Sequence, residues 1–193
     1  MTISSVKTGA VGLSLALDNN YMEPIATTLV GSGGVNQVTF NDIPQTYKHL
    51  QLRIIARTDR GAEKDSLQLQ FNSDTTNGNY YASHYISGNG ASVTFDAQGT
   101  NAYVWLPRYA ADSATASNFG VTVTDILDYT STNKHKVIRN LGGYDNNGTG
   151  QVWLSSGMWF PSNITAITSI KFSPVSGTNI KQYSRFSLYG IKG

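Results

Sequence analysis

The stretch that most constrains the fold is YKHLQLRIIART, residues 47–58. Every second residue from position 50 to position 56 is apolar: Leu50, Leu52, Ile54 and Ala56. Successive side chains of a strand point to opposite sides of a sheet, so this period predicts a half-buried strand rather than a helix. The residues between them are polar except for Ile55, which indicates that the second face of the strand is covered in part.

The same alternation recurs at short intervals along the chain. Apolar residues alternate in segments around Val38, Leu67, Tyr80, Val104, Val121, Val137, Val152, Ile170 and Leu188. Turn signals such as Asn89-Gly90 and Asn147-Gly148 separate several of these segments, because both residue types accept a positive φ. About ten short strands in this arrangement predict an all-β fold, an antiparallel jelly-roll-like β-sandwich. The alternation at Leu188 places the C-terminal residues inside a sheet.

Composition limits the classes of function. Only 13% of the 193 residues are charged and the formal net charge is +2, so we expect no nucleic-acid partner. Cysteine is absent, which excludes disulfides and thiolate metal sites. No apolar run approaches the ~18 residues of a membrane span, so we expect no membrane partner.

Residues 1–34 differ from the rest in composition. They contain small and apolar residues in alternation and end in Gly31-Ser32-Gly33-Gly34, which is typical of a flexible hinge. Two interpretations stay open, a first strand of the sandwich and an arm that lies on a partner. The arm hypothesis divides the chain into an arm with its hinge, 1–34, and a sandwich domain, 35–193. Its expected partner-contact residues are Val11, Leu13, Leu15, Leu17, Tyr21 and Ile25.

Few side chains suggest chemistry. The histidines His49, His84 and His135 lack metal-ligand spacing, and His84 is expected to be partly buried beside Ala82 and Ile86. No Gly-x-Ser-x-Gly elbow is present, and no pair of carboxylates can be assigned from sequence. We expect neither an enzyme nor a cofactor.

Aromatic residues are concentrated in the middle of the chain. They could line a core, a subunit interface or a glycan-binding surface, because rings beside Asn and Asp hold sugars by stacking and hydrogen bonds. The candidates for the exposed surface are Tyr81, Tyr85, Tyr103, Trp105 and Tyr109.

Three groups of short motifs carry a family resemblance. The first joins Gly31-Ser32-Gly33-Gly34 to Val38-Thr39-Phe40, Ile43-Pro44-Gln45-Thr46-Tyr47 and His49-Leu50-Gln51-Leu52-Arg53; the second is Phe71-Asn72 with Asn79-Tyr80 and His84; the third is Phe186-Ser187-Leu188-Tyr189-Gly190-Ile191-Lys192. In this order they resemble small virion structural proteins of tailed bacteriophages, including phages of cyanobacteria. Such proteins occur as capsid decoration (cement) proteins or as domains of tail and head fibres.

The resemblance implies a protein of the outer virion surface, made in the host cytoplasm. A capsid decoration protein that binds the major capsid protein or other virion proteins is the first expectation, since the chain contains no long fibre shaft. The alternative is a tail- or head-fibre domain that recognises host surface glycans. A homo-oligomer is expected in either case, with a trimer as the specific expectation. The motifs carry no catalytic residues.

Overall fold

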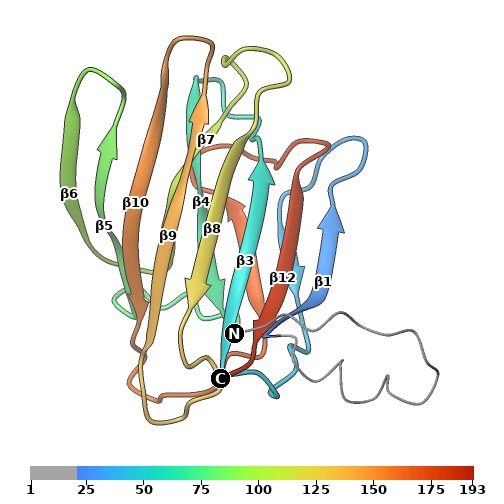
Figure 1. Ribbon diagram of the computed structural model, residues 1–193, viewed down its shortest axis with the longest axis vertical. Coiled ribbons are helices and arrows are strands. Elements are labelled where there is room, and N and C mark those ends of the chain that lie inside the picture. Colours follow the sequence, from blue (N-terminus) through green and yellow to red (C-terminus); the bar gives the residue numbers. More distant parts are fainter. Residues whose placement is uncertain (1–20) are drawn as a thin grey trace, which may run out of the picture.

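The computed structural model describes residues 21–193, which form a sandwich of two antiparallel sheets (Figure 1). This part of the chain contains twelve strands and no helix, and therefore no helix that could cross a membrane. The strands are β1 (Met22–Leu29), β2 (Val38–Phe40), β3 (His49–Ala56), β4 (Lys64–Phe71), β5 (Tyr80–Gly88), β6 (Val93–Asn101), β7 (Val104–Ala110), β8 (Gly120–Ile126), β9 (Lys136–Asp145), β10 (Gly150–Trp159), β11 (Ile170–Pro174) and β12 (Arg185–Ile191).

Eight of these strands have the connectivity of a jelly roll. One sheet begins with the order β1-β12-β3-β8, and the other has the order β2-β11-β4-β7. The chain crosses to the other sheet at each step from β1 to β2, from β2 to β3 and from β3 to β4. Among the eight strands it crosses again from β7 to β8, from β8 to β11 and from β11 to β12. This is the double-sheet arrangement of a jelly roll, so the predicted fold class is confirmed.

The remaining four strands are two hairpins that enlarge one sheet. The β5–β6 hairpin is inserted between β4 and β7, and the β9–β10 hairpin between β8 and β11. Together they continue the first sheet beyond β8 in the order β9-β10-β5-β6, which gives it eight strands (Figure 1). We call these four strands the extension. The second sheet keeps four strands, and its edge strand β7 packs beneath β9, β10 and β5.

The main core lies between the two sheets at the jelly-roll half. Leu50, Leu52 and Ile54 of β3 are completely buried, as are Leu67 and Leu69 of β4. The predicted register of β3 is therefore confirmed. Ile55, on the opposite face of β3, is exposed on the outer surface of the sheet in this chain.

The segment after residue 20 belongs to the sandwich. β1 pairs with β12 from Met22 with Ile191 to Leu29 with Arg185, and Ile25 packs against the core. The Gly31–Gly34 segment is a turn between β1 and β2 in which the Gly34 N–H bonds the Gly31 carbonyl. Residues 22–34 therefore follow the strand interpretation, and an arm that extends to residue 34 is wrong, because Met22–Leu29 pair with β12 of the same chain and Gly31–Gly34 form the turn that follows. Residues 1–20 lie outside the described part.

A bulge changes the predicted facing of β5. The pairing of β5 with β10 shifts between Ser156 and Met158, so Ala82 and Ser83 both face inward near Gly157. His84 and Ile86 consequently point to the outer surface. The expectation that His84 shares a face with Ala82 and is partly buried is wrong, because the bulge reverses the alternation between them.

Candidate functional site

The extension departs from the usual polarity of a sandwich sheet. Antiparallel sheets commonly direct apolar side chains to the core and polar ones to solvent. The extension buries apolar residues such as Ile138 and Trp159, but it also carries aliphatic residues on its outer face: Leu141 of β9 is 62% exposed and Val152 of β10 is 68% exposed. Phe95 on β6 is 82% exposed. Apolar side chains are thus exposed at several positions of the same face.

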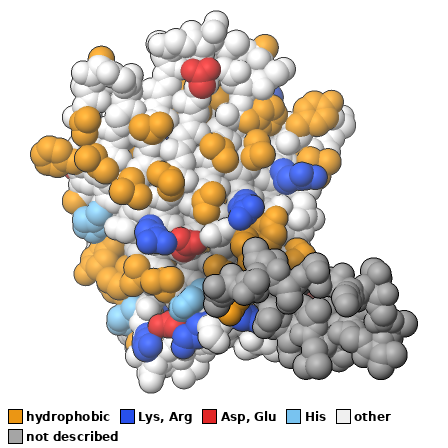
Figure 2. Space-filling model, in the orientation of Figure 1, with side chains coloured by type: hydrophobic (Ala, Val, Ile, Leu, Met, Phe, Trp, Pro, Cys, Tyr) orange, Lys and Arg blue, Asp and Glu red, His pale blue; other side chains and the backbone are white. Residues whose placement is uncertain are grey.

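Strand pairing joins these residues into two adjacent rows across the sheet. One row runs from Ile55 through Val121, Gly143, Val152 and Gly88 to Val93. The next row runs from Val123 through Leu141, Leu154 and Ile86 to Phe95. We call the exposed members of both rows the outer apolar face: Ile55, Ile86, Val93, Phe95, Val121, Leu141, Val152 and Leu154. Figure 2 shows hydrophobic side chains spread across this side of the molecule.

A groove and a polar border shape the outer apolar face. Gly143 has no side chain to fill the first row, and a groove of about 550 Å³ lies there between Val121, Leu141 and Val152. The row beyond Leu141 is polar, and in it the Arg139 guanidinium is 2.8 Å from an Asp125 carboxylate oxygen. Apolar centres with polar rims are characteristic of protein–protein interfaces. Monomers rarely expose a contiguous apolar surface of this kind without a function.

Beneath the outer apolar face, the inner face of β8, β9 and β10 contains a buried polar row. The Thr124 hydroxyl donates to Oδ1 of Asn140 at 2.8 Å, and Nδ2 of Asn140 donates to the Ser155 hydroxyl at 3.1 Å. All three residues are buried. Since an unpaired polar group is costly here, this row fixes β8, β9 and β10 in one register and so keeps the aliphatic residues outward.

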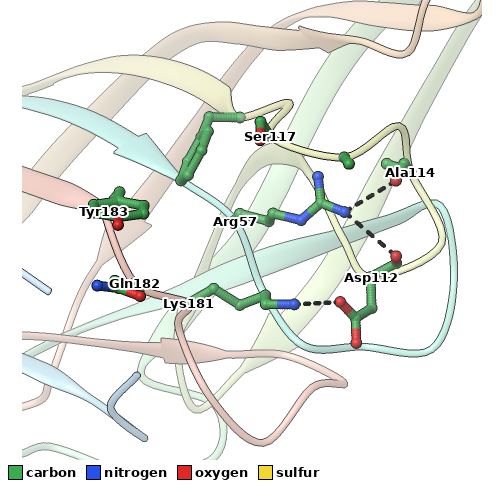
Figure 3. A pocket seen from close by; sticks show the side chains of 9 residues that line it. Arg57, Asp112, Ala114, Ser117, Lys181, Gln182 and Tyr183 are labelled. Atoms are coloured by element: carbon green, nitrogen blue, oxygen red, sulfur yellow. Dashed lines mark hydrogen bonds and ion pairs between the residues drawn. The ribbon is translucent and has the colours of Figure 1, made fainter. Parts of the chain in front are cut away.

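A second candidate site is a pocket of about 360 Å³ beside the loop that precedes β8 (Figure 3). Arg57 forms its floor and is buried, and no carboxylate of residues 21–193 pairs with it. Its guanidinium donates to the carbonyl oxygens of Asp112, Ala114, Thr115 and Asn118, at 2.8–3.3 Å. These bonds hold the loop in shape, while Lys181 forms an ion pair with Asp112 at the rim. With two cations and one carboxylate, the pocket carries a net positive charge.

Two aromatic side chains, Phe119 and Tyr183, also line this pocket. Figure 3 shows Tyr183 on the side away from Asp112. Tyr183 is 67% exposed and has a φ of 70°, and Ser117 across the pocket has a φ of 64°. A bulky residue rarely adopts a positive φ, because its Cβ crowds the backbone. The surrounding hydrogen bonds hold Tyr183 in this conformation, including the bond from its own N–H to the Val30 carbonyl.

The structure separates the aromatic residues that the sequence grouped. Tyr109 is completely buried in the core, so its assignment to an exposed surface is wrong. Tyr81 lies on the outer side of β5, whereas Tyr85 faces inward and stacks on Trp153 with ring centroids 4.1 Å apart. Tyr103, just before β7, stacks on Trp105 of β7 with ring centroids 6.5 Å apart. The five residues therefore do not form one binding surface.

The remaining candidates from the sequence are the arm residues and the oxygen-rich loop segments. Val11, Leu13, Leu15 and Leu17 lie outside the described residues, and Tyr21 is exposed just before β1. In residues 21–193 no three His, Cys, Asp or Glu side chains come together as metal ligands would. Asp74, in a segment with oxygen-rich side chains, instead accepts a hydrogen bond from the Trp159 indole at 2.7 Å. Burial acts to raise the pKa of Asp74, but hydrogen bonds from Trp159, Asn79 and Thr76 outweigh it and hold the pKa below its ordinary value.

Comparisons with known proteins add one remote likeness. No family model matches the chain, and no curated protein matches it. A solved structure, galectin LEC-6 of Caenorhabditis elegans, matches with a TM-score of 0.32 and 8% sequence identity, covering 86% of this chain and 96% of the galectin. A TM-score this low carries no information about function, and the fold assignment above stands on the strand order alone.

Proposed function

We propose that this protein is a structural component of a bacteriophage virion, a capsid decoration protein that attaches to the major capsid protein through its outer apolar face. The observation that carries the proposal is that face itself, eight exposed apolar residues in two paired rows. The virion setting comes from the resemblance of the chain's short motifs to small phage structural proteins.

The chemistry of the outer apolar face suits attachment to another protein. Fully burying one aliphatic or aromatic side chain contributes roughly 1.5–3 kcal/mol, so several of them exceed the cost of docking a preformed rigid surface. The face contains no charged residue at its centre, and Arg139 with Asp125 lies at its border. A partner would therefore present a flat apolar patch with polar residues around it.

The experiment is co-sedimentation of the purified protein with capsids of the phage that encodes it. We expect the unmodified protein to sediment with capsids, and the double variant Leu141→Asp/Leu154→Asp to remain in solution. Ser156→Asp is the matched control, because Ser156 is exposed on the same strand beyond the apolar rows. Equal sedimentation of the double variant and the control would refute the assignment of the face, and no sedimentation of the unmodified protein would refute the function.

A second candidate function is recognition of host surface glycans as a fibre domain, and the pocket between Phe119 and Tyr183 favours it. Aromatic rings beside polar groups hold sugars by stacking, and the net positive charge would favour an acidic sugar. Tyr183→Ala should abolish binding to host polysaccharide, whereas Tyr21→Ala, which removes another exposed tyrosine, should not. Failure of the unmodified protein to bind polysaccharide would eliminate this candidate.

A further inference from the structure

The two cations of the pocket beside Arg57 differ in how far their hydrogen-bond donors are engaged. Both Nη groups of Arg57 donate to carbonyl oxygens of the 112–118 loop, and Arg57 is buried. Its charge therefore acts on the pocket through space, while its hydrogen bonds stay with the loop. Lys181 has a side chain that is 40% exposed, and its ammonium group, with three N–H donors, pairs with Asp112 at the rim. Lys181 is thus the cation that a ligand in the pocket can reach.

The ion pair between Lys181 and Asp112 already places a carboxylate against an ammonium group at the mouth of the pocket. Figure 3 shows the Lys181 side chain extended toward Asp112. The Asp112 side chain is 46% exposed, and within residues 21–193 its carboxylate forms an ion pair with Lys181 alone. Exposed ion pairs of this kind are weak, because water solvates both charges well. A carboxylate that belongs to a ligand can therefore compete with Asp112 for the same ammonium group.

A second hollow determines the side of Lys181 on which such a carboxylate would lie. Lys181 and Gln182 line both the Arg57 pocket and an adjacent hollow of about 260 Å³. The lining of this hollow also contains Asp59, whose charge repels an anion. On the other side, the buried Arg57 guanidinium adds its positive charge to that of Lys181. An anionic group is therefore favoured in the Arg57 pocket and disfavoured in the hollow next to it.

From these contacts we propose that Lys181 is the residue that selects a carboxylate-bearing sugar for this pocket, and that Asp112 is a built-in competitor of that sugar. This role of Lys181 rests on the second candidate function, recognition of a glycan, and is independent of attachment to a capsid. The sugar ring packs against Tyr183 while its carboxylate takes the place of Asp112 at the ammonium group. A uronic acid, whose ring carries a carboxylate directly, is the ligand chemistry that fits this arrangement.

Two forms of one polymer test the selection directly. Polygalacturonate carries a carboxylate on every sugar, and its methyl ester keeps the same rings without the charge. We expect the full chain to bind immobilised polygalacturonate about fivefold more tightly than the methyl ester at low salt, as one exposed ion pair allows. The difference should diminish at high salt, because ions screen exposed charges. Equal binding of the two forms would overturn the proposal, and so would an absence of binding to polygalacturonate.

Three variants assign the preference to named side chains. Lys181→Gln should bind the two forms alike, whereas Asp112→Asn, which removes the competing carboxylate, should bind polygalacturonate about threefold more tightly than the unmodified protein. Lys134→Gln is the matched control, because Lys134 is also an exposed lysine paired with an aspartate, Asp128, near His49 at the other end of β3. It should keep the full preference. A preference that persists in Lys181→Gln, or weaker binding by Asp112→Asn, would refute the roles of these residues.

A comparison with host polysaccharide separates the role of Lys181 from the glycan function on which it rests. Host polysaccharide that binds equally well before and after methyl esterification of its carboxylates would keep that function and refute selection by Lys181. Absence of binding to host polysaccharide, together with a preference for polygalacturonate that Lys181→Gln removes, would refute the function and leave the carboxylate site in place.

Discussion

The two halves of the eight-stranded sheet use the same alternation in opposite ways. In the jelly-roll half, β3 directs Leu52 into the core, where it is completely buried. In the extension, β9 and β10 direct Leu141 and Leu154 to the surface. The difference arises from what lies beneath each half. The second sheet covers the jelly-roll half, whereas the extension reaches beyond it and lies over its edge strand β7, with Phe71 of β4 contacting Tyr80 and Trp159. An alternating pattern therefore identifies a strand, but the neighbouring layer decides which face is buried.

The sharpest test of this comparison places the same charge on each half. Leu52→Asp should destabilise the protein by more than about 4 kcal/mol, because it buries a carboxylate with no partner. Leu141→Asp should change the free energy of unfolding by less than about 1 kcal/mol, since its side chain is already in solvent. Urea denaturation followed by tryptophan fluorescence measures both, and similar losses at the two positions would show that the outer apolar face is covered within the monomer.

A smaller effect is expected from the buried polar row of the extension. Asn140→Ala leaves the hydroxyls of Thr124 and Ser155 without their partner and should cost about 1–3 kcal/mol. Replacing the whole row, Thr124→Val/Asn140→Leu/Ser155→Ala, should restore much of that stability, because no unpaired polar group is left. Thermal unfolding of the two variants compares them. If the triple variant were the less stable one, polar satisfaction would not be what holds these strands together.

The smallest expected effect is a change in stability at low pH, and it depends on the hydrogen bond between Asp74 and Trp159. Asp74 ties the segment before β5 to Trp159 of β10, and its pKa lies below the ordinary value of 3.8. A lowered folded-state pKa adds stability that is complete above the unfolded-state pKa and is lost as pH falls through the folded-state value. Asp74→Asn should therefore be less stable than the unmodified protein at pH 7, with a weaker decline between about pH 4 and pH 2. Parallel declines for the two proteins would assign the acid sensitivity to other carboxylates.

The sequence was sufficient to predict strands wherever the chain alternates without interruption. The registers of β3, β4 and β12 follow from Leu52, Leu69 and Leu188, and all three are buried as their patterns indicate. The facing of β5 could not be predicted, because the bulge near Gly157 depends on the partner strand. Nor could the role of Met22–Leu29, since a strand at a sheet edge and an extended arm have the same local pattern.

The candidate sites depend on contacts that are distant in sequence. Arg57 forms the floor of its pocket by binding carbonyls about sixty residues away, at Thr115 and Asn118. In the sequence, Arg57 lies on the polar side of the strand pattern, which indicates an exposed cation and not a buried one. The outer apolar face was equally hidden, because residues as distant in sequence as Ile55 and Phe95 share one face only through the strand order of the sheet. The one available signal was Ile55, an apolar residue on an otherwise polar face.

The position of β12 has a consequence for how the chain is made. β12 is the last of the twelve strands in residues 21–193, yet it lies between β1 and β3 and pairs with both. During synthesis β1 and β3 therefore cannot complete their sheet until residues 185–191 leave the ribosome. Pairings of such large sequence separation make folding slow, and they leave strand edges open on the nascent chain in the meantime. Until β12 is in place, the open edges of β1 and β3 can pair with the strand edges of other nascent chains.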